Sequence, residues 1–365
     1  MDFLRIQKID LYSYGISLVY PVVVDKHTID ERAGYIIKLT TDNGLYGFGD
    51  IAPLPGLHRE TWGEIPDLIK EISISLMGCR LNLDVLLHGS EILEGNLPPT
   101  VRFGLESAIL TLIDIGFKSA GQKSFFSDLV ADVKINSLID PSEGPVEKAV
   151  LKALACGLTC IKIKMGRQPL ETDIKMIKRL YEIAGDSLTL RLDSNRSWSL
   201  PDAIKFCTEI PIRAIEYLEE PLREPAALEE FYKTLQLPLA VDESLAENDP
   251  ATLLEKDWVH VAVVKPSVLG GIFRTIDLMR HATTLNKKVV ISDTYHSGVG
   301  AAMLIRIAAI RREQMTAAGL DTYSRLQEDI LLERLSFQSG RINQVDAYKK
   351  SRQLNFNSLI RHELY

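Results

Sequence analysis

The stretch Cys160-Ile161-Lys162-Ile163-Lys164-Met165 shows the pattern from which the fold can be predicted. It is a short, mostly apolar run with an ionisable residue near its end, and an amphipathic helical segment follows it. Comparable runs recur along the chain, and strands that alternate with helices are typical of parallel βαβ units. The runs are Val133 to Asn136, Cys160 to Met165, Leu188 to Asp193, Ile215 to Glu219, Pro238 to Asp242, Val261 to Lys265 and Lys288 to Ser292.

An ionisable residue stands at or beside the end of six of these runs, at intervals of 23 to 29 residues. In a (β/α) barrel the carboxyl ends of all strands meet at one mouth, where the active site lies. An open doubly wound sheet concentrates function at its switch point instead. The pattern therefore predicts an α/β barrel of the TIM type. The six residues are Lys164, Asp193, Glu219, Asp242, Lys265 and Asp293.

The first hundred residues show a different pattern of apolar and polar residues. Alternating apolar residues over 11–24 and 35–48, the second interrupted at Asp42-Asn43-Gly44, predict antiparallel strands and a hairpin turn. Apolar residues at helical spacing follow over 61–76 and 107–117. We therefore expect an α+β unit before the barrel.

Composition excludes several classes of protein. Of the 365 residues, 46% are hydrophobic and 25% are charged, which rules out dominant disorder and small disulfide scaffolds. The net charge is −7 and the basic residues are scattered, so we expect no nucleic-acid partner. Neither a secretory leader nor an apolar stretch of about 18 residues is evident, so we expect no membrane contact and a cytoplasmic location.

Three carboxylates follow three successive predicted strands: Asp193, Glu219 and Asp242. Three hard oxygen ligands suit Mg²⁺, which keeps water or substrate in its remaining octahedral positions, and Mn²⁺ can substitute. Asn195 lies two residues beyond Asp193 on the same side of the chain and is expected to support the site. Neighbours on a strand point to opposite faces, so in Glu219-Glu220 the ligand role goes to Glu219.

Lysines flank the predicted ligands. Lys162 and Lys164 share a face of their strand, and their mutual repulsion is expected to leave one of them as a neutral amine, which can act as a base. Lys265 ends the sixth run, across the barrel from the second. A substrate held by the metal would have a lysine on each side, which suits removal of a proton α to a carboxylate.

Each of these residues has an ordinary structural explanation when it is taken alone. A strand-end Asp often caps a helix, and a Lys is usually solvated at the surface. Five of them at near-constant intervals are hard to assign to chance. We expect Glu220, Glu243 and Asp293 to cap helices or support the ligands, and His296 to be either a proton donor or a satisfied loop histidine.

Several motifs occur in an order that matches a known superfamily. They are Lys162-Ile163-Lys164, Arg191 to Asn195, Glu219-Glu220-Pro221, Asp242-Glu243-Ser244 and Lys265-Pro266, with Gly47 to Gly56 and Glu60-Thr61-Trp62 earlier in the chain and Gly319 to Thr322 later. The chain resembles the enolase superfamily, in its muconate lactonising subgroup. Within that subgroup it is similar to the o-succinylbenzoate synthase family, over residues from about 35 to 325.

The resemblance implies the arrangement of the whole chain. An α+β capping domain would occupy residues 1–125, and a modified (β/α)7β barrel would occupy residues 126–325. The tail, from about residue 326 to 365, would pack back on the capping domain.

The resemblance also implies a Mg²⁺-dependent hydro-lyase reaction on a small carboxylate. The reaction is the syn dehydration of 2-succinyl-6-hydroxy-2,4-cyclohexadiene-1-carboxylate to 2-succinylbenzoate, in menaquinone biosynthesis, through a metal-stabilised enediolate. Lys164 would take the α proton and then help water leave. Lys265 would stabilise the enediolate by a cation–π contact from the other face of the ring.

Five further residues are implied in substrate binding. Lys162 would tune Lys164, and the backbone amides near Ser297 would meet the succinyl carboxylate. Two positions depart from the family pattern: His296 stands where many relatives have Glu, and Leu57-His58 stands where Phe-Ser is common. The five are Lys162, Arg191, Asn195, Ser297 and Gly298.

The barrel motifs also fit a second activity. An N-acylamino-acid racemase or dipeptide epimerase needs two lysines on opposite faces, which Lys164 and Lys265 would equally supply. The capping-loop segment Ala52 to Gly56 favours the synthase. A non-catalytic barrel would have lost a ligand or a lysine, and none is lost; the oligomeric state stays open.

Overall fold

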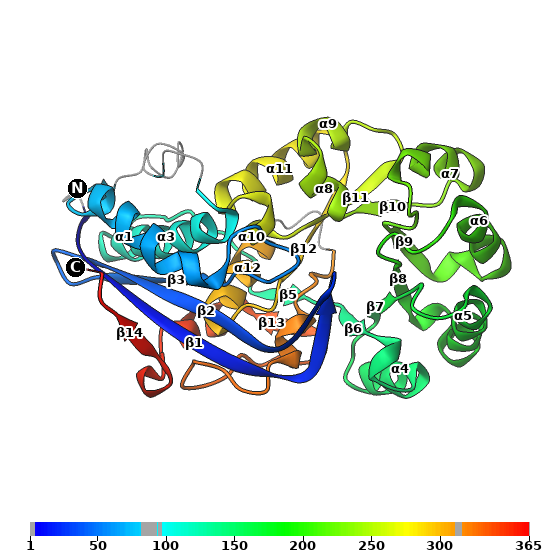
Figure 1. Cartoon of the computed structure of the whole chain (residues 1–365), viewed down its shortest axis with the longest axis horizontal. Helices are drawn as coiled ribbons and strands as arrows, with labels where there is room; N and C mark the ends of the chain where they lie inside the picture. The colour runs from blue at the N-terminus through cyan, green and yellow to red at the C-terminus, as the bar shows by residue number, and fades with distance from the viewer. Residues whose placement is uncertain (1–3, 82–92, 94–96, 311–315, 365) are drawn as a thin grey trace.

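The computed structural model of the chain describes residues 4–81, 93, 97–310 and 316–364. It contains an antiparallel sheet with helices α1 (Ile65–Leu76) and α3 (Pro99–Ser119) beside it, and a parallel sheet ringed by helices (Figure 1). None of the described helices combines the length and apolar character that a membrane crossing needs.

The antiparallel sheet confirms the predicted α+β unit. Its order is β14-β1-β2-β3, and β4 also pairs with β1. The turn at Asp42-Asn43-Gly44 joins β2 to β3, as predicted. Strand β2 starts at His27, before the predicted start at residue 35. The earlier start was not predicted, because residues 27–33 are mostly polar and exposed and show no apolar alternation. The bounds are β1 (Leu4–Val24), β2 (His27–Thr41), β3 (Tyr46–Ile51), β4 (Arg80–Leu81) and β14 (Ile360–His362).

The parallel sheet has the order β12-β11-β10-β9-β8-β7-β6. Parallel bridges join Ile135 to Ala318 and Ser292 to Gly319, so the segment at 318–319 lies between the two ends of the sheet and closes the ring. The predicted (β/α)7β barrel is therefore confirmed. The bounds are β6 (Ser137–Ile139), β7 (Cys160–Lys164), β8 (Thr189–Asp193), β9 (Ile215–Glu219), β10 (Leu239–Val241), β11 (Val259–Val264) and β12 (Lys288–Ile291).

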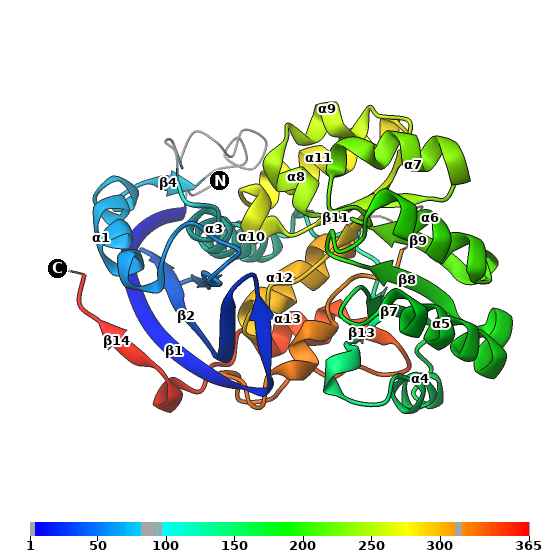
Figure 2. The same ribbon diagram turned by 45° about the vertical axis from the view of Figure 1, so that its right-hand side comes forward.

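Helices surround the parallel strands, and α4 to α7 form the outer side that Figure 2 brings forward. Their apolar residues pack against β6 to β10 in one core, whereas a second core runs from the antiparallel sheet through α3 to α11 and α12. The bounds are α4 (Val146–Ala155), α5 (Leu170–Ala184), α6 (Leu200–Glu209), α7 (Leu228–Leu235), α8 (Glu243–Glu247), α9 (Pro250–Leu254), α10 (Pro266–Leu269), α11 (Ile272–Thr284) and α12 (Gly298–Ala308).

The segment after residue 326 contacts both units. Strand β14 pairs with β1, whereas β13 (Arg341–Asn343) pairs with β5 (Asp132–Lys134) and leads into α13 (Gln344–Ser351). We keep the division into residues 1–125, 126–325 and a tail as a proposal.

The motif Gly47-Phe48-Gly49 has a packing reason. Helix α3 crosses β3 so closely that a Cβ added at Gly49 would overlap the carbonyl oxygen of Gly104, and one at Gly47 would overlap that of Ala108. Only glycine allows this approach. The motif thereby sets how deeply α3 sits between the antiparallel sheet and the barrel.

Helix α11 takes its N-terminal cap from a distant part of the chain. It begins after Gly271, which has no side chain that could act as a cap. Glu106 of α3 fills this role, because its Oε2 accepts the backbone N–H of Ile272 and, at 3.2 Å, that of Phe273. Glu106 is 2% exposed, and burial raises the pKa of its carboxyl to about 7 in spite of these two donors.

We predict that Glu106→Gln removes a pH-dependent loss of stability. The folded-state pKa of Glu106 lies above its ordinary value, so its contribution is most favourable below pH 4.5 and weakens as the pH rises to 7. The raised pKa of Glu106 corresponds to about 3 kcal/mol of the free energy of unfolding. In Glu106→Gln the side-chain amide oxygen still accepts the N–H groups of Ile272 and Phe273. Chemical unfolding at pH 5 and pH 8 should show a smaller decrease in the free energy of unfolding for the variant. An equal decrease in both proteins would contradict this account.

Candidate active site

Strands β7, β8 and β9 carry one part of the site at their carboxyl ends. Their register pairs Lys164 with Asp193 and Asp193 with Glu219, so the three residues lie at one level of the barrel mouth. Lys162 Nζ lies 2.8 Å from Asp193 Oδ2 and 2.6 Å from Glu219 Oε1. Lys164 Nζ lies 2.7 Å from the same Asp193 oxygen. The structure thus brings four of the predicted residues into one cluster.

Strands β10 and β11 add the remaining pair. Asp242 follows β10, Lys265 follows β11, and Lys265 Nζ forms an ion pair with Asp242 Oδ2. In the sheet order, β8, β9 and β10 lie between β7 and β11. The three predicted ligands therefore stand in a row that begins with Lys164 and ends with Lys265.

The charges in this row influence one another strongly. Burial would raise the pKa of Asp193, but the ammonium groups of Lys162 and Lys164 hold it well below its usual range. Burial, followed by the charge of Asp193, raises the pKa of Glu219 to about 8. Burial also disfavours the charge on Lys265, yet Asp242 and Glu243 raise its pKa above the ordinary value.

Lys162 is not the neutral amine that repulsion between the two lysines would favour. Burial works against its charge, but Asp193 and Glu219 together raise its pKa well above the ordinary value. The prediction concerned one of the two lysines without naming it, so these contacts disfavour a neutral Lys162, and a neutral Lys164 stays a prediction. Two carboxylates at hydrogen-bond distance outweigh the repulsion from Lys164.

The contacts of Glu219 test whether the row fits a divalent cation. As the side chains are placed, no three metal-binding groups of the described residues stand close enough together to hold one. Lysine ammonium groups lie between the carboxylates instead. Glu219 Oε2, however, is buried and has no hydrogen-bond partner among the described residues. A hard cation suits such an oxygen, and three carboxylates are a donor set that Mg²⁺ accepts, so the residues fit this ion.

Asn195 connects Lys164 to the start of α8. Its Oδ1 accepts a hydrogen bond from Lys164 Nζ at 2.7 Å, and its Nδ2 donates to Glu243 Oε1 at 2.9 Å. Its φ of 43° is a conformation that asparagine tolerates better than most residues. Asn195 thus orients Lys164, and a contact with substrate stays a prediction.

Arg191 lies deeper in the barrel than the residues at the mouth. Its Nε donates to Glu216 Oε2 at 2.9 Å, and its Nη1 donates to Asn136 Oδ1 at 2.9 Å and to the carbonyl of Ala317 at 2.6 Å. Glu216 lies on the neighbouring strand β9, whereas Asn136 precedes β6 and Ala317 precedes the closing segment at 318–319. The contacts indicate a role in closing the barrel, and the predicted place in the substrate pocket is not tested by them.

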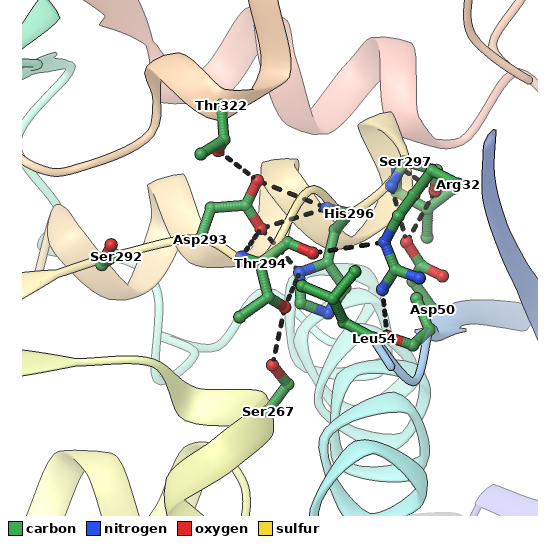
Figure 3. Close-up of polar contacts among 12 residues, drawn as sticks. Arg32, Asp50, Leu54, Ser267, Ser292, Asp293, Thr294, His296, Ser297 and Thr322 are labelled. Carbon is green, nitrogen blue, oxygen red and sulfur yellow. Dashed lines mark hydrogen bonds and ion pairs between the residues drawn. The ribbon is translucent and has the colours of Figure 1, made fainter. Parts of the chain in front are cut away.

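The backbone amides of Ser297 and Gly298 already have partners. Ser297 N–H donates to Asp50 Oδ2 at 2.9 Å, and Gly298 N–H donates to Asp329 Oδ1 at 3.0 Å (Figure 3 shows the Asp50 contact). Asp50 also accepts a hydrogen bond from Tyr14 Oη at 2.8 Å. A substrate carboxylate would have to displace these carboxylates. Binding of substrate by the two amides therefore stays a prediction.

The two departures from the family pattern influence each other. His296 is fully buried; its Nδ1 lies 2.6 Å from Asp293 Oδ1, and its Nε2 has no partner among the described residues (Figure 3). Burial, and then the charges of Arg32 and His296, lower the pKa of His58 to about 3. His58 lies in the loop that begins at Ala52, where its Nδ1 accepts the Leu54 N–H at 2.9 Å, and only one nitrogen of His296 has a partner among the described residues.

Sequence reasoning missed Arg32, the residue that ties this loop to the barrel. Arg32 is fully buried; its Nη1 donates to the carbonyl of Pro53 at 2.8 Å and its Nε to that of Thr294 at 3.3 Å (Figure 3). No sequence signal marks it, because it lies in the polar part of β2. Asp50 was missed as well, although it stands inside the quoted motif Gly47 to Gly56.

Comparison with known proteins agrees with this geometry. The family model "Enolase C-terminal domain-like" matches residues 146–347, and "MenC, N-terminal domain" matches residues 6–112. The o-succinylbenzoate synthase of Yersinia pseudotuberculosis serotype I (strain IP32953) is 31% identical over 326 residues, which are 88% of this chain and 92% of the relative. Protein PHYLLO, chloroplastic, of Arabidopsis thaliana is 28% identical over 350 residues, 85% of this chain; the match spans 20% of that protein.

A solved structure shows the same fold at low sequence identity. It is the dipeptide epimerase from Enterococcus faecalis V583 complexed with Mg and the dipeptide L-Leu-L-Tyr, with a TM-score of 0.80 and 21% identity. The similarity covers 93% of this chain and 97% of that chain. The fold and the sequence matches define one class of protein, the enolase-superfamily enzymes. Within this superfamily the chain belongs to the o-succinylbenzoate synthase family, which makes it a hydro-lyase.

We predict that Asp50→Ala loosens the start of α12. The change leaves the Ser297 amide and the Tyr14 hydroxyl without their acceptor, which costs about 1–3 kcal/mol for each buried group. Hydrogen exchange should become at least about tenfold faster at residues 297–300, since 1.4 kcal/mol is a factor of ten. Tyr14→Phe is the matched control, because it removes the Tyr14 hydroxyl contact with Asp50 and leaves the Ser297 amide with its acceptor. Unchanged exchange in Asp50→Ala would show that the amide is held by other contacts.

Proposed function

We propose that the chain is an o-succinylbenzoate synthase that uses Mg²⁺ to dehydrate 2-succinyl-6-hydroxy-2,4-cyclohexadiene-1-carboxylate to 2-succinylbenzoate, in menaquinone biosynthesis. One observation carries the proposal: Lys164 and Lys265 flank a row of three buried carboxylates at the carboxyl ends of β7 to β11. The 31% identity to a curated synthase supports the substrate assignment. We further propose a cytoplasmic enzyme with a small carboxylate as its substrate.

The residues proposed to hold Mg²⁺ are Asp193, Glu219 and Asp242. The solved epimerase complexed with Mg supports a divalent cation in this fold. When bound, Mg²⁺ supplies positive charge that stabilises the substrate carboxylate while negative charge develops on it, and Mn²⁺ is expected to substitute.

Lys164 is the residue proposed to move the proton. Its amine takes the proton α to the carboxylate, the C–H electron pair becomes a ring double bond, and the C–O bond on the neighbouring carbon breaks. Lys164 returns the proton to the departing hydroxyl, so water leaves from the same face. Because Lys162 binds Asp193 Oδ2 independently, that oxygen stays neutralised when Lys164 turns toward the substrate.

Lys265 is proposed to work from the opposite end of the row. Its contact with Asp242 keeps the side chain charged, and the ammonium group stabilises the anionic ring by a cation–π contact. The same placement would let Lys265 donate a proton from the second face. This gives the alternative activity, racemisation of an N-acylamino acid or epimerisation of a dipeptide, which the fold of the epimerase also supports.

We predict that Lys164→Ala lowers kcat for dehydration by roughly 10²–10⁴-fold, the usual contribution of a general acid–base group. The assay follows loss of the cyclohexadiene absorbance with Mg²⁺ and again after a chelator, which should also abolish activity. Lys205→Ala is the control, since that lysine is half-exposed and pairs with the surface residue Glu171.

Two outcomes would contradict the proposal in different ways. Full activity of Lys164→Ala would remove this lysine from the reaction. A folded wild-type enzyme that leaves the diene untouched, yet exchanges the α hydrogen of N-acylamino acids or dipeptides with D₂O, would support the alternative activity.

A further inference from the structure

Glu220 follows the proposed ligand Glu219 but plays no part in the reaction described above. It is fully buried and has a φ of 41°, in a region that residues with long side chains rarely adopt. Such a conformation costs about 1–3 kcal/mol and persists only where surrounding contacts hold it. The contacts of Glu220 therefore need an explanation.

The side chain of Glu220 accepts four hydrogen bonds, three from the segment at the start of α8 and one from Arg196 in the loop after β8. Oε1 accepts the backbone N–H of Asp242 at 3.0 Å and that of Ser244 at 2.8 Å. Oε2 accepts the Ser244 hydroxyl at 3.0 Å and Arg196 Nε at 3.1 Å. The carboxylate thus binds directly to the backbone of one proposed metal ligand.

The backbone of Glu220 joins two further segments. Its carbonyl oxygen accepts the Ser194 hydroxyl at 3.1 Å and the Arg196 N–H at 2.7 Å, both in the loop that follows Asp193. Its own N–H donates to the carbonyl of Ala240 at 3.1 Å. One residue therefore connects the segments that carry all three carboxylates of the row.

Asp242 has particular need of such a contact. Its backbone, with φ −126° and ψ −76°, lies outside the regular helical and extended regions. The N–H that Glu220 accepts belongs to this residue. Without that acceptor, Asp242 would relax toward a commoner conformation and its carboxylate would move relative to Asp193 and Glu219.

We propose that Glu220 is a positioning residue that sets the spacing of Asp193, Glu219 and Asp242 and thereby the affinity for the divalent cation. This rests on the proposed function, which assigns the cation to these three carboxylates. Groups that orient metal ligands typically contribute 10–100-fold to metal affinity. Glu220 acts through the backbone and does not touch substrate or metal.

The test is the dissociation constant for Mn²⁺, measured by calorimetry and by the electron paramagnetic resonance signal of free Mn²⁺. Glu220→Asp keeps the charge beside Arg196 but shortens the side chain, and we expect its Kd to rise about 10–100-fold. Glu220→Gln keeps the reach and one acceptor oxygen, and its Kd should change less than that of Glu220→Asp. Glu247→Gln is the matched control: it weakens the other ion pair of Arg196 without touching Asp242, and its Kd should equal that of the wild type.

A second readout separates positioning from general stability. At saturating Mg²⁺, kcat of Glu220→Asp should return to within a few-fold of the wild type, while the Mg²⁺ concentration for half-maximal rate stays raised. A purely structural role would lower the melting temperature and leave the Kd of the folded protein unchanged. If Glu220→Asp does not fold, the double variant Glu220→Met, Arg196→Met is measured instead. It removes both partners of the ion pair between Arg196 and Glu220, a change that proteins often tolerate. The same rise in Kd is expected.

The outcomes distinguish the two levels of the proposal. A wild-type protein that binds no Mn²⁺ would overturn the metal assignment itself. A wild-type protein that binds one Mn²⁺, together with Glu220 variants that bind it equally well, would overturn the positioning role and leave the proposed function intact.

Discussion

Three buried carboxylates stand side by side at the ends of β8, β9 and β10, and the structure depends on how their charge is balanced. Burying one unpaired carboxylate is costly, and neighbouring negative charges increase the cost. Lys162 and Lys164 neutralise Asp193 and Glu219 from one side, and Lys265 neutralises Asp242 from the other. The balance leaves Glu219 Oε2 buried and without a hydrogen-bond partner in the part of the chain that the structure describes. The cluster is therefore arranged to accept more positive charge.

The rest of the fold keeps these groups in place. The strand register puts Lys164, Asp193 and Glu219 at one level, and the segment at 318–319 closes the ring. Arg32 of β2 binds the backbone carbonyls of Pro53, after β3, and of Thr294, after β12, and so joins the antiparallel sheet to the barrel. Close contact between β3 and α3 sets how near this helix lies to the antiparallel sheet. The chemistry at the mouth thus depends on contacts between segments far apart in the sequence.

Much of this arrangement could be predicted from local patterns. The alternation of strands and helices, with an ionisable residue at or beside six of the seven predicted strand ends, predicted the barrel and brought Lys164, Asp193 and Glu219 together. It placed the first barrel strand at Val133 to Asn136, whereas β6 spans Ser137–Ile139. The early start of β2 was missed because residues 27–33 carry no apolar alternation. The cap that Glu106 provides for α11 and the bridging by Arg32 were missed because they join residues more than 100 positions apart, which no local signal reveals. The sequence did not indicate which of Lys162 and Lys164 is the neutral amine, because the charge of Lys162 depends on two carboxylates from neighbouring strands.

The central claim is that the row of carboxylates is a divalent-cation site. Crystals equilibrated with Mn²⁺ and measured at the manganese absorption edge test it most directly. The account predicts one strong anomalous peak bounded by carboxylate oxygens of Asp193, Glu219 and Asp242. A peak elsewhere, or no peak while Lys162 still bridges Asp193 and Glu219, would contradict it.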